Sequence, residues 1–225
     1  MRGFTEISLL WDLSQKYHSM ILGGYARYCL SQNSTPFFAL DVDLFPQSNG
    51  DSLGLVEALK SLGFKVKHEN EISFSFAKRE DHENPYWRIC PNIQVIKPVI
   101  EGAIVTVGKM EDVLDNFDFS ITRCGLLSPT QGLAGEEFLV DESSHHLILK
   151  NIHCPISSLH RCIKYSKKGY FLPLAETVKL FLDWDERTPE YKDKLIEMIG
   201  KMKGVDGVEP KKEDIEELEK LMHVD

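Results

Sequence analysis

Residues 21–45, with the sequence ILGGYARYCLSQNSTPFFALDVDLF, decide the fold class. A short apolar run ends there at Gly23 and Gly24, a helical pattern follows, and an apolar strand then carries Asp41 and Asp43. Side chains alternate along a strand, so aspartates at positions i and i+2 lie on the same side. Because the residues around them are apolar, the pattern predicts a partly buried sheet face that presents two carboxylates.

A pair of carboxylates in a poorly hydrated place is unfavourable unless a cation lies between them. Mg²⁺, or Mn²⁺ in its place, suits such a pair, since hard cations prefer oxygen ligands and Mg²⁺ is commonly held by one or two carboxylates plus substrate phosphates. A lone D-x-D is more often a solvated strand end. The assignment of Asp41 and Asp43 as metal ligands and catalytic residues therefore depends on the residues that precede them.

The preceding residues favour a bound phosphate. Gly23 and Gly24 stand at a helix start, where backbone N–H groups are free to bind an anion. Arg27 lies one turn into that helix and can neutralise phosphate charge. The combination of two glycines, an arginine and a D-x-D strand is much more specific than any one of them, and it predicts a nucleotide-binding site.

Composition excludes several classes of protein. The chain has 225 residues, of which 42% are hydrophobic and 27% charged, as in an ordinary globular protein. No apolar run is long enough for a transmembrane helix, and the N-terminus does not resemble a signal peptide. The net charge of −9 argues against a protein that coats long nucleic acid, but not against an enzyme that grips one nucleic-acid end.

The cysteine pattern indicates free thiols in a reducing compartment, and hence a cytoplasmic location. Their number is odd and none forms a C-x-x-C pair; they are Cys29, Cys90, Cys124, Cys154 and Cys162. A zinc site built from Cys154, His153 and His160 matches no standard ligand spacing and is disfavoured.

Hydrophobic periodicity divides the chain into an α/β head over residues 1–150 and a small helical region over residues 151–225. In the head, the patterns predict helices at 6–20, from about 25, at 53–62 and at 111–116, strands at 37–45, 63–70, 71–79, 92–100 and 117–128, and a hairpin with a polar tip at 138–151. In the second region they predict helices within 157–173, 174–186, 190–202 and 211–224.

The order G-G-x-x-R followed by D-x-D-L-F resembles the nucleotidyltransferase superfamily of DNA polymerase β. Within it, the similarity is greatest to the head of tRNA CCA-adding enzymes and bacterial poly(A) polymerases. Residues 116–127 are similar to that family's R-R-D-F-T-I-N-A-L motif, and residues 158–172 to its arginine-rich helix that ends at Gly-Phe. The resemblance covers about residues 15–172. It implies an α/β (α+β) fold with a mixed sheet and flanking helices.

The chain also departs from the family pattern. Asn116 and Phe117 stand where the family has two arginines, and the E-D-x-x-R motif that guides ordered addition of C, C and A is not recognisable. Gln94 stands where the third metal carboxylate is expected. Three explanations remain open: Asp118 replaces the missing acid, the site works with two carboxylates, or the strand is misaligned and Glu101 takes the place.

Two further groups of residues are candidates for binding. By resemblance, Asp118 and Arg123 would line the nucleotide pocket. Arg161, Lys164 and Lys168 fall at helical i, i+3 and i+7 positions, which suits a face that binds acceptor phosphates. An ordinary solvated helix face explains the same spacing equally well.

The sequence therefore predicts an enzyme that moves a nucleoside monophosphate from a nucleoside triphosphate to an acceptor hydroxyl. The resemblance favours an RNA 3′ end, tRNA-like, as the acceptor, and the oligomeric state is not indicated. One alternative is a toxin or regulatory nucleotidyltransferase that modifies a protein or a small molecule. The other is an inactive homologue that binds nucleotide or RNA.

Overall fold

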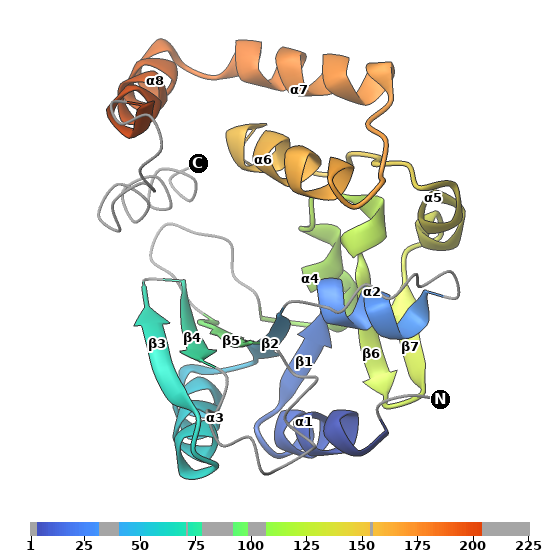
Figure 1. Cartoon of the computed structure of the whole chain (residues 1–225), viewed down its shortest axis with the longest axis vertical. Helices are drawn as coiled ribbons and strands as arrows, with labels where there is room; N and C mark the ends of the chain where they lie inside the picture. Colours follow the sequence, from blue (N-terminus) through green and yellow to red (C-terminus); the bar gives the residue numbers. More distant parts are fainter. Residues whose placement is uncertain are drawn as a thin grey trace.

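The computed structural model describes residues 4–31, 41–70, 72–77, 92–98, 107–153 and 155–203. A seven-stranded mixed sheet with the order β3-β4-β5-β2-β1-β6-β7 forms the centre of the fold (Figure 1). Its strands are β1 (Ser19–Leu22), β2 (Val42–Pro46), β3 (Lys65–Glu69), β4 (Ser73–Ala77), β5 (Ile93–Ile96), β6 (Cys124–Ser128) and β7 (Gln131–Ala134). The predicted fold class, a mixed sheet with flanking helices, is confirmed.

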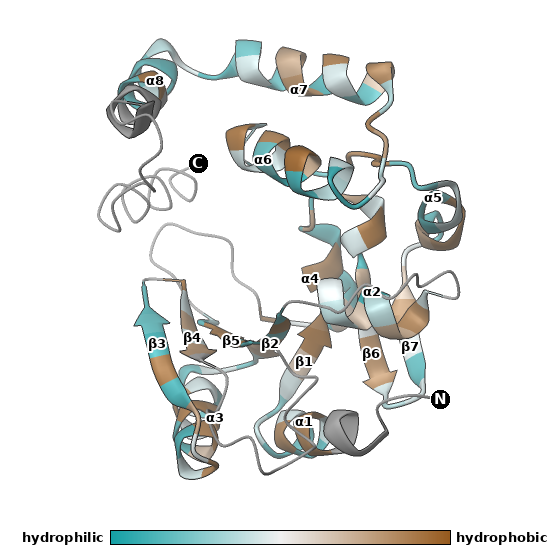
Figure 2. Cartoon of the chain, viewed as in Figure 1, coloured by the Kyte–Doolittle hydropathy of each residue, from teal (hydrophilic) through white to brown (hydrophobic). Residues whose placement is uncertain are grey.

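Only the β2–β5 pair is parallel among these strands, and it aligns Asp43 with Gln94. β1 runs antiparallel to β2 and pairs Leu22 with Asp43. The edge strand β3 is largely hydrophilic, whereas β1 near the centre carries mostly apolar residues (Figure 2). The end of β1, which leads into Gly23, therefore lies next to the start of β2, which carries Asp43, at the centre of the sheet.

Eight α-helices and a short 3₁₀ turn are described. The helices are α1 (Phe4–Lys16), α2 (Gly24–Leu30), α3 (Asn49–Ser61), α4 (Met110–Asp115), α5 (Phe138–Ser144), α6 (Pro155–Ser166), α7 (Leu174–Glu186) and α8 (Pro189–Lys203), and the 3₁₀ turn η2 is Ser120–Thr122. The last three helices confirm the helical character predicted for residues 155–203, and the fourth helix predicted for the second region, over 211–224, lies outside the described residues. Figure 1 shows α6 over the head and α7 alongside α6, on the side away from the sheet.

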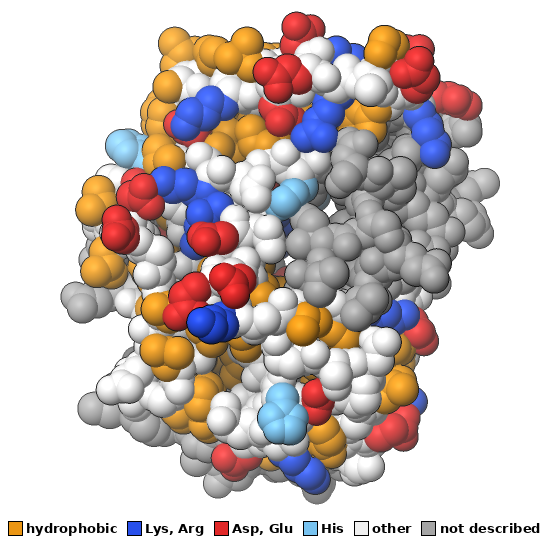
Figure 3. All heavy atoms as spheres, turned by 180° about the vertical axis from the view of Figure 1, so that it is seen from behind, with side chains coloured by type: hydrophobic (Ala, Val, Ile, Leu, Met, Phe, Trp, Pro, Cys, Tyr) orange, Lys and Arg blue, Asp and Glu red, His pale blue; other side chains and the backbone are white. Residues whose placement is uncertain are grey.

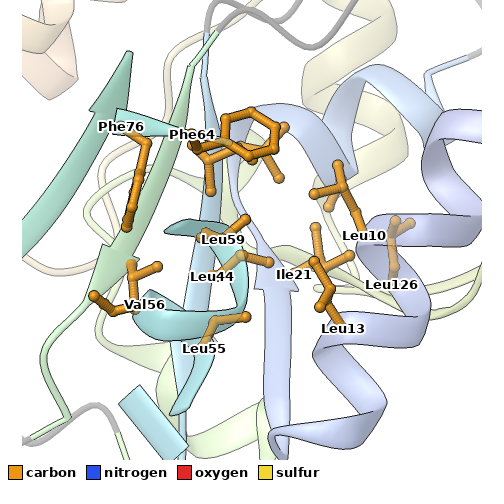
Figure 4. Close-up of a cluster of buried hydrophobic side chains, with 14 of the residues drawn as sticks. Leu10, Leu13, Ile21, Leu44, Leu55, Val56, Leu59, Phe64, Phe76 and Leu126 are labelled. Atoms are coloured by element: carbon orange, nitrogen blue, oxygen red, sulfur yellow. The ribbon is translucent and has the colours of Figure 1, made fainter. Parts of the chain in front are cut away.

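The main core fills one face of the sheet. Side chains from α1 and α3 pack there on inward residues of β1, β2 and β4 (Figure 4). Those labelled in the close-up are Leu10, Leu13, Ile21, Leu44, Leu55, Val56, Leu59, Phe64, Phe76 and Leu126. The opposite face holds a smaller cluster of Leu22, Phe45, Val113 and Leu114. Val42 and Leu44 thus face the main core, and the alternation of β2 turns Asp43 and Phe45 to the opposite face.

A third cluster joins the head to the helical region. Phe119, Ile121, Leu147 and Leu149 from residues before 150 pack with four residues after it, which are Cys162, Tyr165, Tyr170 and Leu180. The two regions that composition separates therefore share an apolar core.

Several predicted boundaries are wrong. The helix predicted over 6–20 ends at Lys16, because His18 adopts φ 38 and the chain then enters β1. The third helix begins at Asn49 rather than 53, since the Ser48 hydroxyl caps it by accepting a hydrogen bond from the Asp51 N–H at 3.0 Å.

The hairpin predicted over residues 138–151 is also wrong. α5 occupies its first half and ends where His145 takes a left-handed conformation with φ 56. The inward face of α5 consists of Phe138, Asp141 and Glu142, so two of its three buried residues are acidic. Polar residues at buried positions hide the helical periodicity. Residues after the helix form isolated bridges, including Phe119–Leu149, and no hairpin.

Candidate active site

The two glycines and the two aspartates meet where β1 ends. Gly23 has φ 70 and ψ −132, a backbone conformation that residues with a Cβ rarely adopt. A Cβ at Gly23 would lie 3.8 Å from Oδ2 of Asp43, and one at Gly24 would lie 3.9 Å from Oδ1 of Asp41. The backbone of the glycine pair therefore approaches both carboxylates, as the sequence pattern suggested.

The carboxylate of Asp43 is buried at Oδ1 and is repelled by the neighbouring carboxylate of Asp41. Burial, with a second contribution from the neighbouring Asp41 carboxylate, raises the pKa of Asp43 to about 7, while Lys164 and Arg161 oppose the rise. Its Oδ1 atom is buried and has no hydrogen-bond partner among the described residues. A cation bound between Asp41 and Asp43 would satisfy that oxygen and relieve the repulsion, so the pair fits a divalent metal ion.

Gln94 occupies the position expected for a third carboxylate. It is paired with Asp43 in the β2–β5 ladder, so the two side chains project from the same face of the sheet. Its Nε2 donates to the Ser75 hydroxyl at 3.3 Å. Gln94 therefore lies beside Asp43, and its correspondence to the family's third carboxylate stays a prediction. Glu101, the other candidate for this place, lies outside the described residues.

Arg27 is buried beside this site with only 8% of its surface exposed. The centre of its guanidinium lies 5.0 Å from the ring centroid of Tyr165 and 5.2 Å from that of Tyr170. Its Nη1 atom has no hydrogen-bond partner among the described residues. The two tyrosine rings stabilise the positive charge of the guanidinium, but they do not accept a hydrogen bond from its Nη1. An anion next to Nη1 would accept that hydrogen bond, so the arrangement suits a bound anion.

Two basic residues of α6, and Lys168 just after it, lie near the aspartates. The helix predicted within 157–173 ends at Ser166, so the helical i+7 spacing predicted for Lys168 is wrong. Arg161 and Lys164 are close enough to lower the pKa of Asp43. The pKa of Lys168 is lowered by burial and by Arg27 and Lys164, against the effect of Asp41. Arg161 and Lys164 of α6 and the nearby Lys168 thus place positive charge next to the carboxylate pair, and the purely solvated explanation of this face does not account for the placement.

Asp118 and Arg123 have partners within the protein. The buried Asp118 Oδ2 accepts hydrogen bonds from the Arg161 guanidinium at 2.8 Å and the Ser158 hydroxyl at 3.1 Å. Arg123 donates to the Phe117 carbonyl at 3.0 Å and to the Asp115 carbonyl at 2.6 Å. Asp118 therefore anchors α6 next to the site, which favours a site with two carboxylates over replacement by Asp118. The roles of Asp118 and Arg123 toward a nucleotide stay predictions.

Sequence reasoning missed the residues that support the site from a distance. Ser75 and the ring pair Tyr165 and Tyr170 carry no motif, and only the alternation of serine and phenylalanine along β4 signals that one of its faces is polar. Cys29, Cys124 and Cys162 are free thiols, as predicted, whereas Cys90 and Cys154 lie outside the described residues.

Within the described ranges, no group of three or more His, Cys, Asp or Glu side chains is arranged to bind a metal ion. The candidate centre at Asp41 and Asp43 has two carboxylates and is consistent with that finding. In the part of the chain that the structure covers, no helix is both long enough and apolar enough to cross a membrane.

No protein-family model matches the sequence, and no curated protein is significantly similar to it. Solved structures do match. The CCA-adding enzyme of Thermotoga maritima in complex with tRNA has 17% identity and a TM-score of 0.51, covering 77% of this chain and 40% of that one. An apo CCA-adding enzyme has 13% identity and a TM-score of 0.52, covering 96% and 49%.

A tRNA nucleotidyltransferase bound to a primer tRNA and an incoming ATP analogue has 14% identity and a TM-score of 0.50, covering 93% of this chain and 58% of that one. This chain thus spans about half the length of the solved structures that it matches. At such identities the similarity concerns the fold alone. The chain has a nucleotidyltransferase-like fold of the kind found in CCA-adding enzymes.

Proposed function

We propose that this protein is a Mg²⁺-dependent nucleotidyltransferase that moves a nucleoside monophosphate from a nucleoside triphosphate to a hydroxyl at an RNA 3′ end. The observation that carries the proposal is the meeting of Asp41 and Asp43 with the backbone of Gly23 and Gly24, beside the buried Arg27. A carboxylate pair and a cationic group next to exposed backbone are what a metal–triphosphate complex requires.

In this proposal, Asp41 and Asp43 would hold the ion, and Gly23 and Gly24 leave room for the triphosphate next to them. When bound, Mg²⁺ lowers the pKa of an acceptor hydroxyl and neutralises phosphate charge. The hydroxyl oxygen forms a bond to the α-phosphorus, the bond to the bridging oxygen of the β-phosphate breaks, and pyrophosphate leaves. Arg27 would bind a phosphate oxygen through Nη1, which has no hydrogen-bond partner among the described residues.

RNA is the favoured acceptor for two reasons. Solved structures with this fold include one with tRNA and one with a primer tRNA and an ATP analogue. Arg161 and Lys164 of α6, with Lys168 just after it, add positive charge next to the carboxylates, in a chain whose net charge is −9. A local basic face in an acidic protein suits the capture of one nucleic-acid end.

The test is incubation of the purified protein with total RNA, each labelled nucleoside triphosphate in turn, and Mg²⁺ or Mn²⁺, followed by analysis of label in RNA and in protein. We expect label in RNA, and we expect Asp41→Ala and Asp43→Ala each to remove nearly all of it. Glu57→Ala is the matched control, because Glu57 is an exposed acid on α3, across the sheet from the site.

The outcomes separate the candidate functions. Label in protein instead of RNA would identify a regulatory or toxin-like transferase. Nucleotide binding without transfer of label would identify an inactive homologue, which the neutral Gln94 at the third position makes a real alternative. Transfer at the wild-type rate by the Asp41→Ala, Asp43→Ala double variant would refute the site assignment.

A further inference from the structure

A row of polar side chains crosses the sheet next to the carboxylate pair. The strand registers align Asp43 on β2 with Gln94 on β5, and Gln94 with Ser75 on β4. The neighbours of these residues alternate to the other side, since Val42, Ile93, Val95 and Phe76 belong to the main core. Asp43, Gln94 and Ser75 therefore project together from the face opposite that core.

The hydrogen bond within this row orients the Gln94 amide. Nε2 of Gln94 donates to the Ser75 hydroxyl at 3.3 Å, on the β4 side. An amide carries its nitrogen and its oxygen on opposite sides of the same carbon. With Nε2 turned toward β4, the acceptor Oε1 is turned away from β4. The neighbouring strand on that other side is β2, which carries Asp43.

We propose that Gln94 is a neutral third oxygen ligand of the ion held by Asp41 and Asp43, and that Ser75 is the residue that positions it. This inference rests on the metal site of the proposed function and deepens it. The buried Asp43 Oδ1, which lacks a partner among the described residues, lies on the strand next to the amide. A carbonyl oxygen is an ordinary ligand for Mg²⁺ or Mn²⁺.

A neutral ligand changes the charge at the site. Asp41 and Asp43 already balance one divalent cation, and a third carboxylate would leave a net negative charge in a place where the Asp43 Oδ1 is buried. The amide completes the oxygen set without adding that charge. The protein alone should then bind the ion weakly, and a triphosphate should supply the remaining negative ligands.

The experiment is a titration of the full chain with Mn²⁺ alone, in which free Mn²⁺ is measured by electron paramagnetic resonance. We expect Gln94→Leu and Ser75→Ala to weaken binding, the latter by roughly tenfold, as is typical for loss of a residue that orients a ligand. Gln94→Glu should strengthen binding by about tenfold because it adds a charge. Ser75→Ala added to Gln94→Glu should change the affinity by less than about twofold, since either carboxylate oxygen can bind.

Ser73→Ala is the matched control. Ser73 lies on the same face of the same strand, but its hydroxyl bonds to Asn70. Thermal unfolding of each variant confirms that it is folded. If Gln94→Leu and Ser75→Ala bind Mn²⁺ as tightly as Ser73→Ala does, the inference is overturned.

A different result is expected if Asp41 and Asp43 do not bind the ion. To detect it, Asp41→Asn and Asp43→Asn are titrated with Mn²⁺ in the same way. Loss of Mn²⁺ binding in these two variants, with full binding in Gln94→Leu, would reject the amide ligand and leave the carboxylate pair in place. Unchanged binding in the aspartate variants would reject the proposed metal site, and the inference with it.

Discussion

At Arg27, a guanidinium group lies against the rings of Tyr165 and Tyr170 while its Nη1 atom lacks a hydrogen-bond partner among the described residues. A buried N–H left without a partner costs about 1–3 kcal/mol. Ring faces offset part of that cost, and a phosphate oxygen would offset the rest. The residue is therefore suited to a protein that spends much of its time with an anion bound.

We expect inorganic tripolyphosphate with Mg²⁺ to raise the unfolding temperature of the wild type, and to raise that of Arg27→Gln much less. At a ligand concentration near a hundred times Kd, the shift for a chain of this size should be roughly 5 °C. The measurement is thermal unfolding followed by circular dichroism. Arg187→Gln serves as control, because that arginine pairs with Asp183 on α7. An equal shift in Arg27→Gln and wild type would show that Arg27 does not bind the phosphates.

The raised pKa of Asp43 predicts how the stability of the protein depends on pH. Because burial and Asp41 raise its pKa to about 7, the folded state retains a proton that the unfolded state has already released. The unfolded state therefore binds fewer protons between the two pKa values, and stability falls as the pH rises from about 4 to about 7. Asp43→Asn removes this penalty. It should raise the free energy of unfolding by roughly 2–4 kcal/mol at about pH 8 and by little at about pH 4.

Urea denaturation in the presence of a chelator measures this difference. Asp51→Asn is the comparison, since hydrogen bonds from Ser48 and His18 lower the pKa of Asp51 and the sign of its effect is opposite. Parallel pH profiles for wild type and Asp43→Asn would contradict the assignment of a protonated Asp43. Added Mg²⁺ should stabilise the wild type most at high pH, where both carboxylates are ionised.

On the scale of elements, α6 is held to the head by the ion pair between Arg161 and Asp118. The Asp118 side chain is 6% exposed, and that of Arg161 is 53% exposed. Arg161→Ala would leave Asp118 buried with only the Ser158 hydroxyl as partner. Because solvent screens the exposed guanidinium, we expect a loss of roughly 1–2 kcal/mol in the free energy of unfolding.

Lys164→Ala separates stability from binding on the same helix face. Lys164 is exposed, so its removal should change stability little. It should flatten the dependence of log K on log salt for RNA binding by roughly 0.7, the value for one lost phosphate contact on a single strand. Fluorescence anisotropy across a salt series measures this slope. An unchanged slope would show that the α6 face is only solvated.

The elements predicted correctly from the sequence are those in which the apolar run and the spacing of the polar residues indicate the same structure. The strand predicted around Asp43 is confirmed, because an apolar run fixes β2, which begins directly after Asp41. The β2–β5 register places Gln94 beside Asp43, while its role as a substitute for a third carboxylate stays a prediction. α5 was missed because two of its three buried residues are Asp141 and Glu142, so no apolar stripe marks the helix.

Contacts between distant segments could not be predicted in this way. Arg27 meets Tyr165 and Tyr170 across more than a hundred residues, and no local periodicity encodes that meeting. The partner of Asp118 is likewise 43 positions away. The sequence thus suggested the chemical groups of the candidate site, whereas the residues that pack against them emerged only from the structure.

On the scale of the whole molecule, the head and the helical region are joined by one apolar cluster, which includes Phe119, Leu149, Tyr165 and Leu180. The buried Glu176 of α7 adds a hydrogen bond from the Leu149 N–H at 2.8 Å. On the face shown in Figure 3, acidic and basic side chains are interspersed among the coloured residues. The contacts that join the two regions are therefore the apolar cluster and the buried hydrogen bond of Glu176.

A chain cut after residue 153 should lose the cover of this cluster and fail to fold cooperatively. Exposing a contiguous apolar surface of this kind also favours aggregation. A chain cut after residue 187 retains α6 and α7 and should show one sharp transition in urea. Size-exclusion chromatography and urea denaturation of both chains test this. A stable, monomeric chain of residues 1–153 would show that the head folds independently.

The pairing of Asp43 with Gln94 has a consequence for folding. A parallel pair has no hairpin to set its register, so β5 must find its place on β2 through the inward packing of Ile93 and Val95. A slip by one residue would put an aliphatic side chain beside Asp43 in place of the amide. An ion bound at the proposed site would therefore stabilise the chain in which β2 and β5 have paired in this register over chains in which the pairing has slipped.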